Sequence, residues 1–307
     1  MTIKTVFETR KPKPEGFFEA LVNRFMEKRL KRLAARHGAQ GQRMVIFSHD
    51  LMGTQINLYG RGERDEIEDL LLFLAPVMEL LKDGVALDVG ANVGNHATAF
   101  ADHFATVLAY EPNPEVHELL VINTRKRPNV RTFNYGLGAR RATVRFLEGQ
   151  GNLGESRVVD AAEAGTAPEG RSVIEVKLER MDDVLSDCNQ AVALIKIDVE
   201  GHEYQVLEGG AETLSTQSPI VVFEQHRGEF SGGTTPSIEL LRSLGYTLCW
   251  SEYPRERARF SVVREAMKIA DRLTRRRPRI VTGEAVTVKS HSMLIAVPAR
   301  FRAALLG

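Results

Sequence analysis

Residues 86–95 read ALDVGANVGN, and this stretch carries the signal that decides the fold. It continues a short apolar run, Val85–Val89, which predicts a buried β-strand interrupted by the carboxylate of Asp88. Gly90 allows a tight turn with positive φ, and Gly94 lets that turn pack closely on the helix that follows. In open α/β folds, ligands bind at the carboxyl ends of the strands. The stretch therefore predicts a strand that ends in a ligand-binding loop.

A second acid indicates which ligand this loop binds. Asn92 and Asn95 can bond to the loop or cap the next helix, and the pattern D-x-G-x-N-x-G differs from the dinucleotide motif G-x-G-x-x-G. Glu111 ends the next predicted strand, Val107–Tyr110, about 20 residues farther on, where nucleoside-binding folds place a ribose carboxylate. Asp88 would repel a phosphate and attract a cation, which favours S-adenosylmethionine over NAD. A generic tight turn with a surface glutamate is the simpler alternative.

Strands and helices alternate along the rest of the chain. Such alternation predicts crossover units and a mainly parallel sheet covered on both faces, an α/β doubly wound fold. Strands are predicted at 85–89, 107–110, 130–135, 194–199, 220–223, 246–250 and 293–297, and helices at 95–104 and 114–124 and in the segments YQVLEGGAETL and PSIELLRSLG.

Including the regions outside this core, the sequence predicts that the chain is divided into three parts. Residues 1–40 form an irregular arm and a basic amphipathic helix, Phe17–His37, which we expect to pack on the main domain, with contact to a membrane surface or an acidic partner as the alternative. Residues 41–84 form a hairpin and a helix that lead into a main domain at 85–300. Within that domain lie a glycine-rich loop at 149–172 and a strongly basic helical insertion at 255–280, which we interpret as a solvated charged face.

Composition predicts an ordinary enzyme of a reducing compartment. The 307 residues are 43% hydrophobic and 26% charged, and the net charge of +1 indicates no particular partner. The two cysteines, Cys188 and Cys249, are too few for a disulfide framework. Because the sequence shows neither an apolar run of about 20 residues nor the apolar core of a signal peptide, we expect a cytoplasmic protein. The oligomeric state is not predicted.

Four segments together resemble a known family. LDVGANVGNHA, YEPNP, LIKIDVEGHEYQVLEGGAETL and PIVVFEQH are similar to the FkbM-type S-adenosylmethionine-dependent methyltransferases, from about residue 85 to residue 226. The resemblance implies a class I, Rossmann-like methyltransferase fold, usually with seven strands of which the last is antiparallel. It also implies O-methylation, typically of sugars or polyketide-like metabolites, with S-adenosylmethionine as cofactor. The candidate cofactor-binding residues are Asp88, Gly90, Asn92, Gly94, Asn95, Glu111 and Asn113.

Ionisable residues follow two later predicted strands at the same edge of the sheet. Asp198, Glu200 and His202 are the catalytic candidates, because a hydroxyl must lose its proton as it attacks the methyl donor. Glu224 and His226 follow the next strand and are candidates for contacts with the acceptor. Glu200 and His202 could equally serve only the start of the next helix. Asp198, Glu224 and His226 could hold a divalent cation, but we favour a metal-free site.

The loop GQGNLGES adds one more candidate. Asn152 lies in this loop at the predicted ligand edge. The family resemblance implies a lid that lies over the donor here, and we expect Asn152 to contact the acceptor, although a hairpin tip without a role would look the same. The sequence thus predicts an O-methyltransferase that acts on a hydroxyl of a carbohydrate or secondary metabolite.

Two other functions compete with this prediction. An NAD-linked oxidoreductase is disfavoured by the loop pattern and by the lack of a Ser-Tyr-Lys array. A nucleic-acid-binding protein would use the basic insertion, but Phe260 is its only aromatic residue, so stacking on bases has little support. We therefore expect a small-molecule or glycan acceptor and no nucleic acid.

Overall fold

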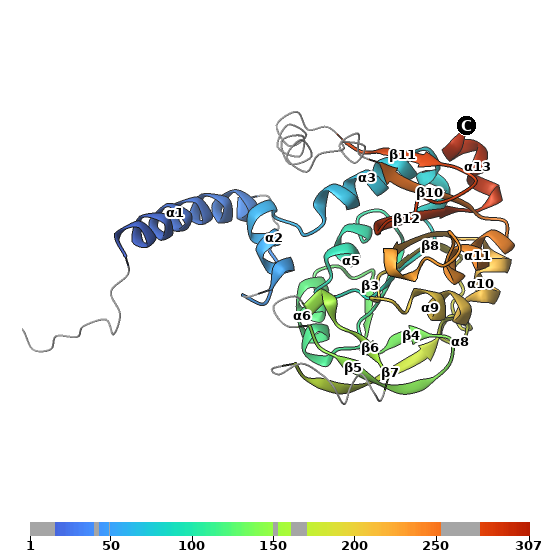
Figure 1. Cartoon of the computed structure of the whole chain (residues 1–307), viewed down its shortest axis with the longest axis horizontal. Helices are drawn as coiled ribbons and strands as arrows, with labels where there is room; N and C mark the ends of the chain where they lie inside the picture. Colours follow the sequence, from blue (N-terminus) through green and yellow to red (C-terminus); the bar gives the residue numbers. More distant parts are fainter. Residues whose placement is uncertain (1–15, 40–42, 49, 150–152, 161–170, 253–276) are drawn as a thin grey trace, which may run out of the picture.

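The computed structural model describes residues 16–39, 43–48, 50–149, 153–160, 171–252 and 277–307. Most of the predicted N-terminal arm, the loop residue Asn152 and most of the basic insertion 255–280 lie outside these residues. In the part of the chain that is described, an eight-stranded sheet forms the centre and a four-stranded sheet lies beside it (Figure 1).

The large sheet has the predicted arrangement. From β3 to β9 its five strands run parallel, and β12, the last in the chain, is antiparallel to both of its neighbours. This confirms a doubly wound, mainly parallel sheet whose last strand is antiparallel. One edge strand, β11, is added to the seven that the resemblance implied. In spatial order the strands are β11 (Arg279–Thr282), β10 (Thr247–Glu252), β12 (His291–Val297), β9 (Ile220–Gln225), β8 (Val192–Ile197), β1 (Val85–Val89), β2 (Thr106–Tyr110) and β3 (Val130–Phe133).

Helices cover both faces of this sheet. Leu87 of β1 belongs to an apolar cluster with α9, α10 and α11, and its neighbour Ala86 belongs to a cluster on the other face with α3, α5, α6 and α13. Because both faces are buried, the central strands read as continuous apolar runs. The helices span Glu203–Gly209 (α9), Ala211–Gln217 (α10), Pro236–Ser243 (α11), Arg64–Leu74 (α3), Asn95–Phe100 (α5), Pro114–Thr124 (α6) and Ala299–Leu306 (α13).

The smaller sheet comes from the region that breaks the alternation. The strands on either side of the glycine-rich loop at 149–172 are β5 and β7, which pair antiparallel. The spatial order is β4 (Gly136–Gly138), β7 (Val173–Arg180), β5 (Ala142–Leu147) and β6 (Arg157–Val159), with η2 (Leu153–Glu155) before β6 and α8 (Met181–Leu185) after β7. Its strand β4 packs against α9, and the small sheet lies below the large sheet in the view of Figure 1.

The predicted lead-in hairpin is wrong, because its second strand is a helix, α2 (Leu51–Tyr59). The Asp50 side chain accepts a hydrogen bond from the Gly53 N–H at 3.2 Å, and Gly60, at φ +84°, donates its N–H to the Ile56 carbonyl. The caps at both ends thus stabilise a helix where the short apolar run had predicted a strand. The helix predicted next is divided by Pro76 into α3, η1 (Ala75–Val77) and α4 (Met78–Leu81).

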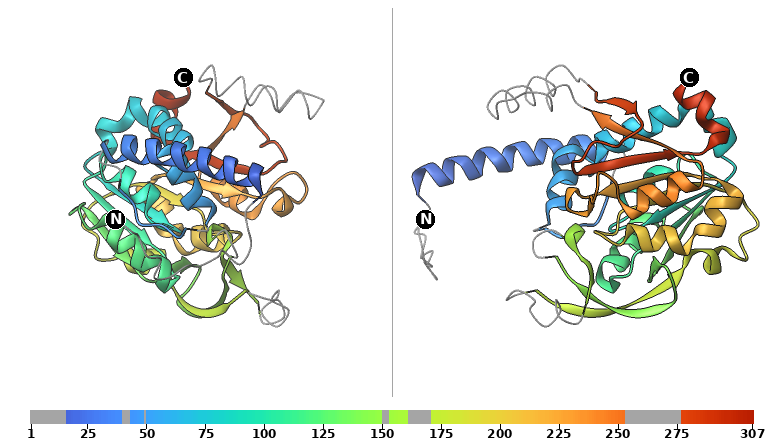
Figure 2. Two further views of the ribbon diagram at one scale, coloured as in Figure 1. Left: turned by 90° about the vertical axis from the view of Figure 1, so that its left-hand side faces the viewer. Right: turned by 45° about the vertical axis from the view of Figure 1, so that its right-hand side comes forward.

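The first helix, α1 (Phe17–Ala39), begins where predicted but runs through Gly38. The expectation that it packs on the main domain is wrong: it contacts α2, and most of its side chains are exposed. It extends away from the two sheets in Figure 1 and in the right-hand view of Figure 2. Among the described helices, α1 included, none combines the length and the apolar character needed to cross a bilayer.

Candidate functional site

The loop after β1 is fixed against the ends of two neighbouring strands. Gly90 and Ala91 donate their N–H groups to the Tyr110 carbonyl at 3.0 and 2.9 Å. Gly90 has φ +75°, and a Cβ built on it would lie 1.8 Å from the Asp198 carbonyl oxygen. Gly94, at φ +91°, packs in the same way against α6. A side chain at Gly90 would therefore push the loop away from the end of β8.

Glu111 closes β2 directly opposite this loop. Its carboxylate accepts the N–H of Asn92 at 3.0 Å and the N–H of Asn113 at 2.9 Å. The Asn113 side chain caps α6 by accepting from the Glu115 N–H and donates to Glu148. Burial raises the pKa of Glu111 to about 7, although the two N–H donors pull this pKa downward. Each carboxylate oxygen has capacity for a second hydrogen bond, as a ribose diol would require.

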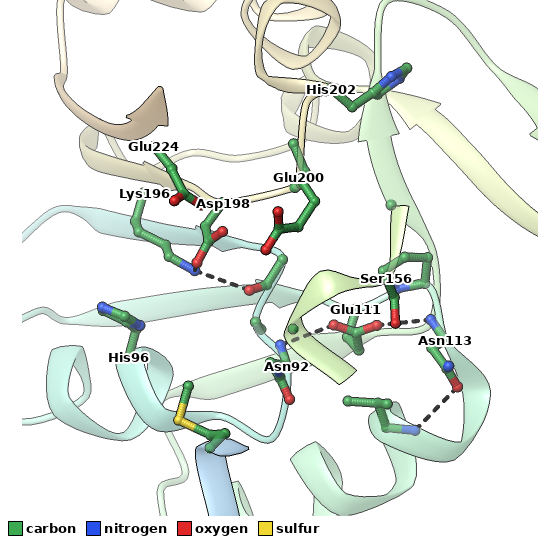
Figure 3. Close-up of a pocket in the computed structure, with 18 of the residues that line it drawn as sticks. Asn92, His96, Glu111, Asn113, Ser156, Lys196, Asp198, Glu200, His202 and Glu224 are labelled. Carbon is green, nitrogen blue, oxygen red and sulfur yellow. Dashed lines mark hydrogen bonds and ion pairs between the residues drawn. The ribbon is translucent and has the colours of Figure 1, made fainter. Parts of the chain in front are cut away.

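A cavity of about 220 Å³ runs from Glu111 to the end of β8 (Figure 3). The loop after β1 forms its floor, and Gly154 and Ser156 of the small-sheet region line another side. A further side comes from α2, the helix that was predicted as part of a hairpin. Its lining residues are Leu51, Met52 and Gln55.

Lys196 of β8 connects the loop to the carboxylates. Its Nζ lies 3.3 Å from Asp88 Oδ1 and 3.5 Å from Asp198 Oδ2, and it donates to the Gly90 carbonyl at 3.0 Å. Burial lowers the pKa of Lys196, but the charges of Asp88 and Asp198 outweigh burial and leave the pKa above its ordinary value. Asp88, predicted at the ligand, is fully buried and does not line the cavity. It acts on the site through Lys196.

A second cavity of about 60 Å³ adjoins the first. Five ionisable residues line both cavities and so form what we call the junction: Glu63, His96, Lys196, Asp198 and Glu224. Glu63 Oε2 lies 3.5 Å from His96 Nδ1. Burial and then the charge of Asp198 raise the pKa of Glu63 to about 7. Burial and then the charge of Lys196 lower the pKa of His96 well below its ordinary value.

Sequence reasoning missed Glu63 and His96. His96 directly follows the glycine loop, and its place in the first turn of α5 was a readable signal. Glu63 gave none, because it reaches the site only through the turn between α2 and α3, where its φ is +47°. Such a strained non-glycine conformation is typical of functional positions.

Three further candidates meet at the ends of β8 and β9. Glu200 Oε2 lies 3.2 Å from His226 Nε2, and Glu224 Oε1 lies 3.9 Å from His226 Nδ1. One ligand atom from each lies within 4.8 Å of the others, a set that suits a divalent cation. The divalent-cation site considered from the sequence had the same Glu224 and His226 but Asp198 in place of Glu200. Burial, then the charges of Asp198 and Glu200, raise the pKa of Glu224 to about 9.

Two further candidates, His202 and Asn95, also line the larger cavity but contact other groups than the carboxylates. His202 points away from the carboxylates in Figure 3 and faces β4, where its Nε2 would lie 3.2 Å from a Cβ built on Gly138. Burial lowers the pKa of His202. Asn95 donates to the Gly62 carbonyl at 2.5 Å and so ties α5 to the turn before α3. The structure thus gathers Asp198, Glu200, Glu224 and His226 but not His202.

With this geometry established, known proteins can be compared. A family model described as the methyltransferase FkbM domain matches residues 88–248, which include the glycine loop, Glu111 and the junction residues of β8 and β9. The chain belongs to the FkbM methyltransferase family. The resemblance inferred from the four sequence segments is confirmed.

Two curated relatives are similar to this FkbM chain. Hexuronic acid methyltransferase AglP of Haloferax volcanii is 31% identical over 171 residues, which cover 55% of this chain and 64% of the relative. The match thus spans less than two thirds of the length of AglP. The 2-O-methyltransferase NoeI of Sinorhizobium fredii is 26% identical over 186 residues, which cover 56% of this chain and 76% of the relative.

Two solved structures are also similar to the FkbM chain. An FkbM methyltransferase from Methylobacillus flagellatus is 14% identical with a TM-score of 0.36, over 71% of this chain and 54% of that chain. Fibrillarin from Aeropyrum pernix, in complex with S-adenosyl-L-methionine, is 12% identical with a TM-score of 0.40, over 76% and 75% of the two chains. At these scores neither structure adds an argument about the site, so the fold rests on the strand order described above.

Proposed function

We propose that this FkbM chain is an S-adenosylmethionine-dependent O-methyltransferase that acts on a hydroxyl group of a carbohydrate. The observation that carries the proposal is the cavity that begins at Glu111 and ends at the junction. A nucleoside end and a proton-accepting end are thus joined in one cavity. The relatives AglP, a hexuronic acid methyltransferase, and NoeI, a 2-O-methyltransferase, support a sugar hydroxyl as the acceptor.

The residues present fit such a donor. S-Adenosylmethionine, when bound, supplies a methyl group on a positively charged sulfur. Glu111 has spare acceptor capacity for the ribose hydroxyls, with its carboxylate already oriented by two backbone N–H groups. At the other end, Asp198 lies 3.5 Å from the buried cation Lys196, and Glu63, Glu200 and Glu224 line the same cavity. This excess of acid favours a cationic ligand over a phosphate-bearing one such as NAD.

Asp198 is the proposed general base. It lines both cavities, so its carboxylate lies where a hydroxyl in the smaller cavity would meet the donor in the larger one. Lys196, 3.5 Å away, holds this carboxylate in position. Asp198 takes the hydroxyl proton as the oxygen attacks, since a base within hydrogen-bond reach is required at that moment. Glu200 and His226, themselves in contact, are proposed to orient the acceptor.

The proposal also covers the class of acceptor and the cellular compartment. A glycan or small molecule is proposed rather than nucleic acid, because Lys196 is the one Lys or Arg among the described residues lining the cavity, and it is already paired with Asp88 and Asp198 and so does not offer a phosphate site. Cys188 and Cys249 are free thiols, which supports a reducing compartment such as the cytoplasm.

The experiment has two stages. Titration calorimetry of the full chain with S-adenosylmethionine, S-adenosylhomocysteine and NAD is expected to show binding of the first two. The chain is then incubated with isotope-labelled donor and a panel of hexuronic acids and neutral sugars, and mass spectrometry is expected to detect a labelled methyl ether. NAD binding without S-adenosylmethionine binding would refute the proposal, as would donor consumption with the methyl group on nitrogen or carbon.

A further inference from the structure

Helix α1 exposes a continuous apolar surface. Large apolar side chains recur along it at four-residue steps, which places them in two adjacent rows on one side of the helix. We call these the apolar rows: Phe17, Leu21 and Phe25 in the first, and Phe18, Val22, Met26 and Leu30 in the second. All seven are exposed, from 38% for Val22 to 87% for Phe17. Single exposed apolar residues are ordinary, but a contiguous set of this size marks an interaction surface.

Cations border the apolar rows. Arg24, Lys28, Arg32 and Arg36 recur at the same four-residue step, in a row next to the first apolar row, and we call them the basic row. The whole helix contains six Lys or Arg residues and two Glu, a net charge of +4. One of these acids, Glu27, is ion-paired with Lys31 at 2.7 Å. Because the complete sequence carries only +1, α1 is, like the segment 255–280, far more positive than the chain as a whole.

We propose that α1 docks on an anionic phospholipid bilayer. The apolar rows would enter the boundary between headgroups and acyl chains, and the basic row would lie against the lipid phosphates. Phenylalanine and leucine on one side, with lysine and arginine beside them, are the composition of helices that lie in the membrane interface. The long Lys and Arg stems let the charges stay in the headgroup layer while the apolar rows are buried. This proposal concerns binding and does not depend on the methyltransferase reaction.

A second copy of the chain matches this surface less well. Pairing the apolar rows of two α1 helices would bring two helices of charge +4 together, and nearby like charges repel. An anionic bilayer satisfies both features of the surface, the apolar rows and the basic row. Because α1 contacts α2, and α2 lines the larger cavity, docking would also hold that cavity close to the membrane.

Flotation of the full chain with vesicles tests the proposal. We expect binding to phosphatidylcholine vesicles that contain about 30% phosphatidylglycerol, weaker binding to phosphatidylcholine alone, and a decrease as salt rises from about 0.1 M to about 0.5 M. Replacing the four basic-row residues by Gln should reduce partitioning by about 600-fold, because each of the four cations contributes about fivefold. Phe18→Ser with Phe25→Ser should abolish the vesicle-bound fraction at every lipid composition.

Matched controls separate the surface from general effects. Leu80→Ser changes an exposed leucine on α4, and Arg125→Gln with Lys126→Gln removes two exposed charges next to α6; both variants should bind vesicles like the wild type. Melting temperature and S-adenosylmethionine affinity should stay unchanged in every variant, so a failed vesicle experiment and a failed donor experiment are distinguishable. Absence of vesicle binding by the wild type would overturn the proposal. So would a concentration-dependent dimer that the Phe18 and Phe25 substitutions abolish while vesicle binding persists.

Discussion

Lys196 and Asp88 form an ion pair inside the large sheet, with 3.3 Å between Nζ and Oδ1. Both side chains are buried, and the same Lys196 Nζ donates to the Gly90 carbonyl and lies 3.5 Å from Asp198. One cation thus joins the donor loop, its own strand and the proposed base. The pair arises because β1 and β8 are in register, with Asp88 opposite Lys196.

Removing this cation should destabilise the fold. Lys196→Met leaves the fully buried Asp88 without its partner, and breaking a buried pair typically costs about 3–5 kcal/mol of the free energy of unfolding. Urea denaturation measures the loss. The double variant with Asp88→Asn should recover part of it, because no charge is then left uncompensated. Equal stability of Lys196→Met and the wild type would show that the pair is not needed.

The same pair shows where sequence reasoning stops. Asp88 was predicted to contact the ligand because it sits at a strand end, but only the register between β1 and β8 decides that it faces Lys196 instead. Glu111 and α6 were predictable, since a strand-end acid and a proline in the first helical turn are local signals. Glu63 was not, because tertiary packing of α2 and α3 brings it to the site.

A second lesson comes from the lead-in segment. Its short apolar run fitted a strand as well as a helix, and length alone could not decide between them. The caps Asp50 and Gly60 were in the sequence and would have favoured the helix. For α1, the helix itself was predicted correctly, but the sequence did not show that its large apolar side chains would be exposed.

Glu111→Ala should weaken binding of S-adenosylmethionine by about 1.5–3 kcal/mol, because charge-assisted hydrogen bonds to the ribose are lost. Titration calorimetry measures the affinity. Glu118→Ala removes an exposed carboxylate on α6, the helix that follows Glu111, and serves as the matched control. Its donor affinity is expected to match that of the wild type. An unchanged affinity in a folded Glu111→Ala protein would rule out the ribose assignment.

Gly90→Ala should abolish donor binding and lower stability by at least ~2 kcal/mol, since a positive φ and a close approach both exclude a Cβ. The new methyl group would lie 1.8 Å from the Asp198 carbonyl, so the loop or β8 must move. Gly228→Ala is the control, because a Cβ there meets nothing within 4 Å. Calorimetry and thermal denaturation of both variants decide the matter, and normal donor binding by Gly90→Ala would show that the loop tolerates displacement.

Stability should fall as pH rises from about 7 to about 9. Burial, with the charges of Asp198 and Glu200, raises the pKa of Glu224 to about 9, so the native state holds a proton that the unfolded chain has lost above its ordinary pKa near 4.3. The native state therefore loses relative stability throughout this window. The pKa values of Glu63, Glu111 and Glu203 are raised to about 7, so these three groups act mainly below the window.

Glu224→Gln provides the check on this pH dependence. It removes the main titrating group, so the melting temperature should fall much less between pH 7 and pH 9. The fall that remains comes from the Cys249 thiol, because burial raises its pKa to about 11. His96 and His202, whose pKa values are lowered by burial, are neutral in the native state and destabilise it only as pH falls below about 6.5. A wild-type melting temperature that rises over this window would contradict the assignment to Glu224.

Chelation should leave the reaction unchanged if the site is metal-free, as we propose. Glu200 and His226 contact one another at 3.2 Å, and Lys196 supplies positive charge beside Asp198. Turnover after treatment with EDTA, and again after adding Mg²⁺ or Mn²⁺, is therefore expected to equal that of the untreated protein. A loss with EDTA that a divalent cation restores would instead assign a cation to Glu200, Glu224 and His226.

Three substitutions distinguish the proposed general base, Asp198, from the neighbouring residues Glu200 and His202. Asp198→Asn keeps the size of the side chain but cannot accept the hydroxyl proton, so turnover should fall by ~100-fold or more while donor affinity changes little. Glu200→Gln should mainly raise the acceptor KM, because this residue is proposed to orient the acceptor together with His226. His202→Asn should keep turnover near that of the wild type, since His202 points away from the junction.

These three variants are to be compared with donor affinity, melting temperature and turnover measured on each. A base shows lost turnover with retained donor affinity, whereas a structural residue shows a lowered melting temperature and normal turnover in the folded fraction. If Asp198→Asn retains wild-type turnover and Glu200→Gln loses it, the base is Glu200. In that case the Lys196 contact at 3.5 Å serves only to neutralise Asp198 within the sheet edge.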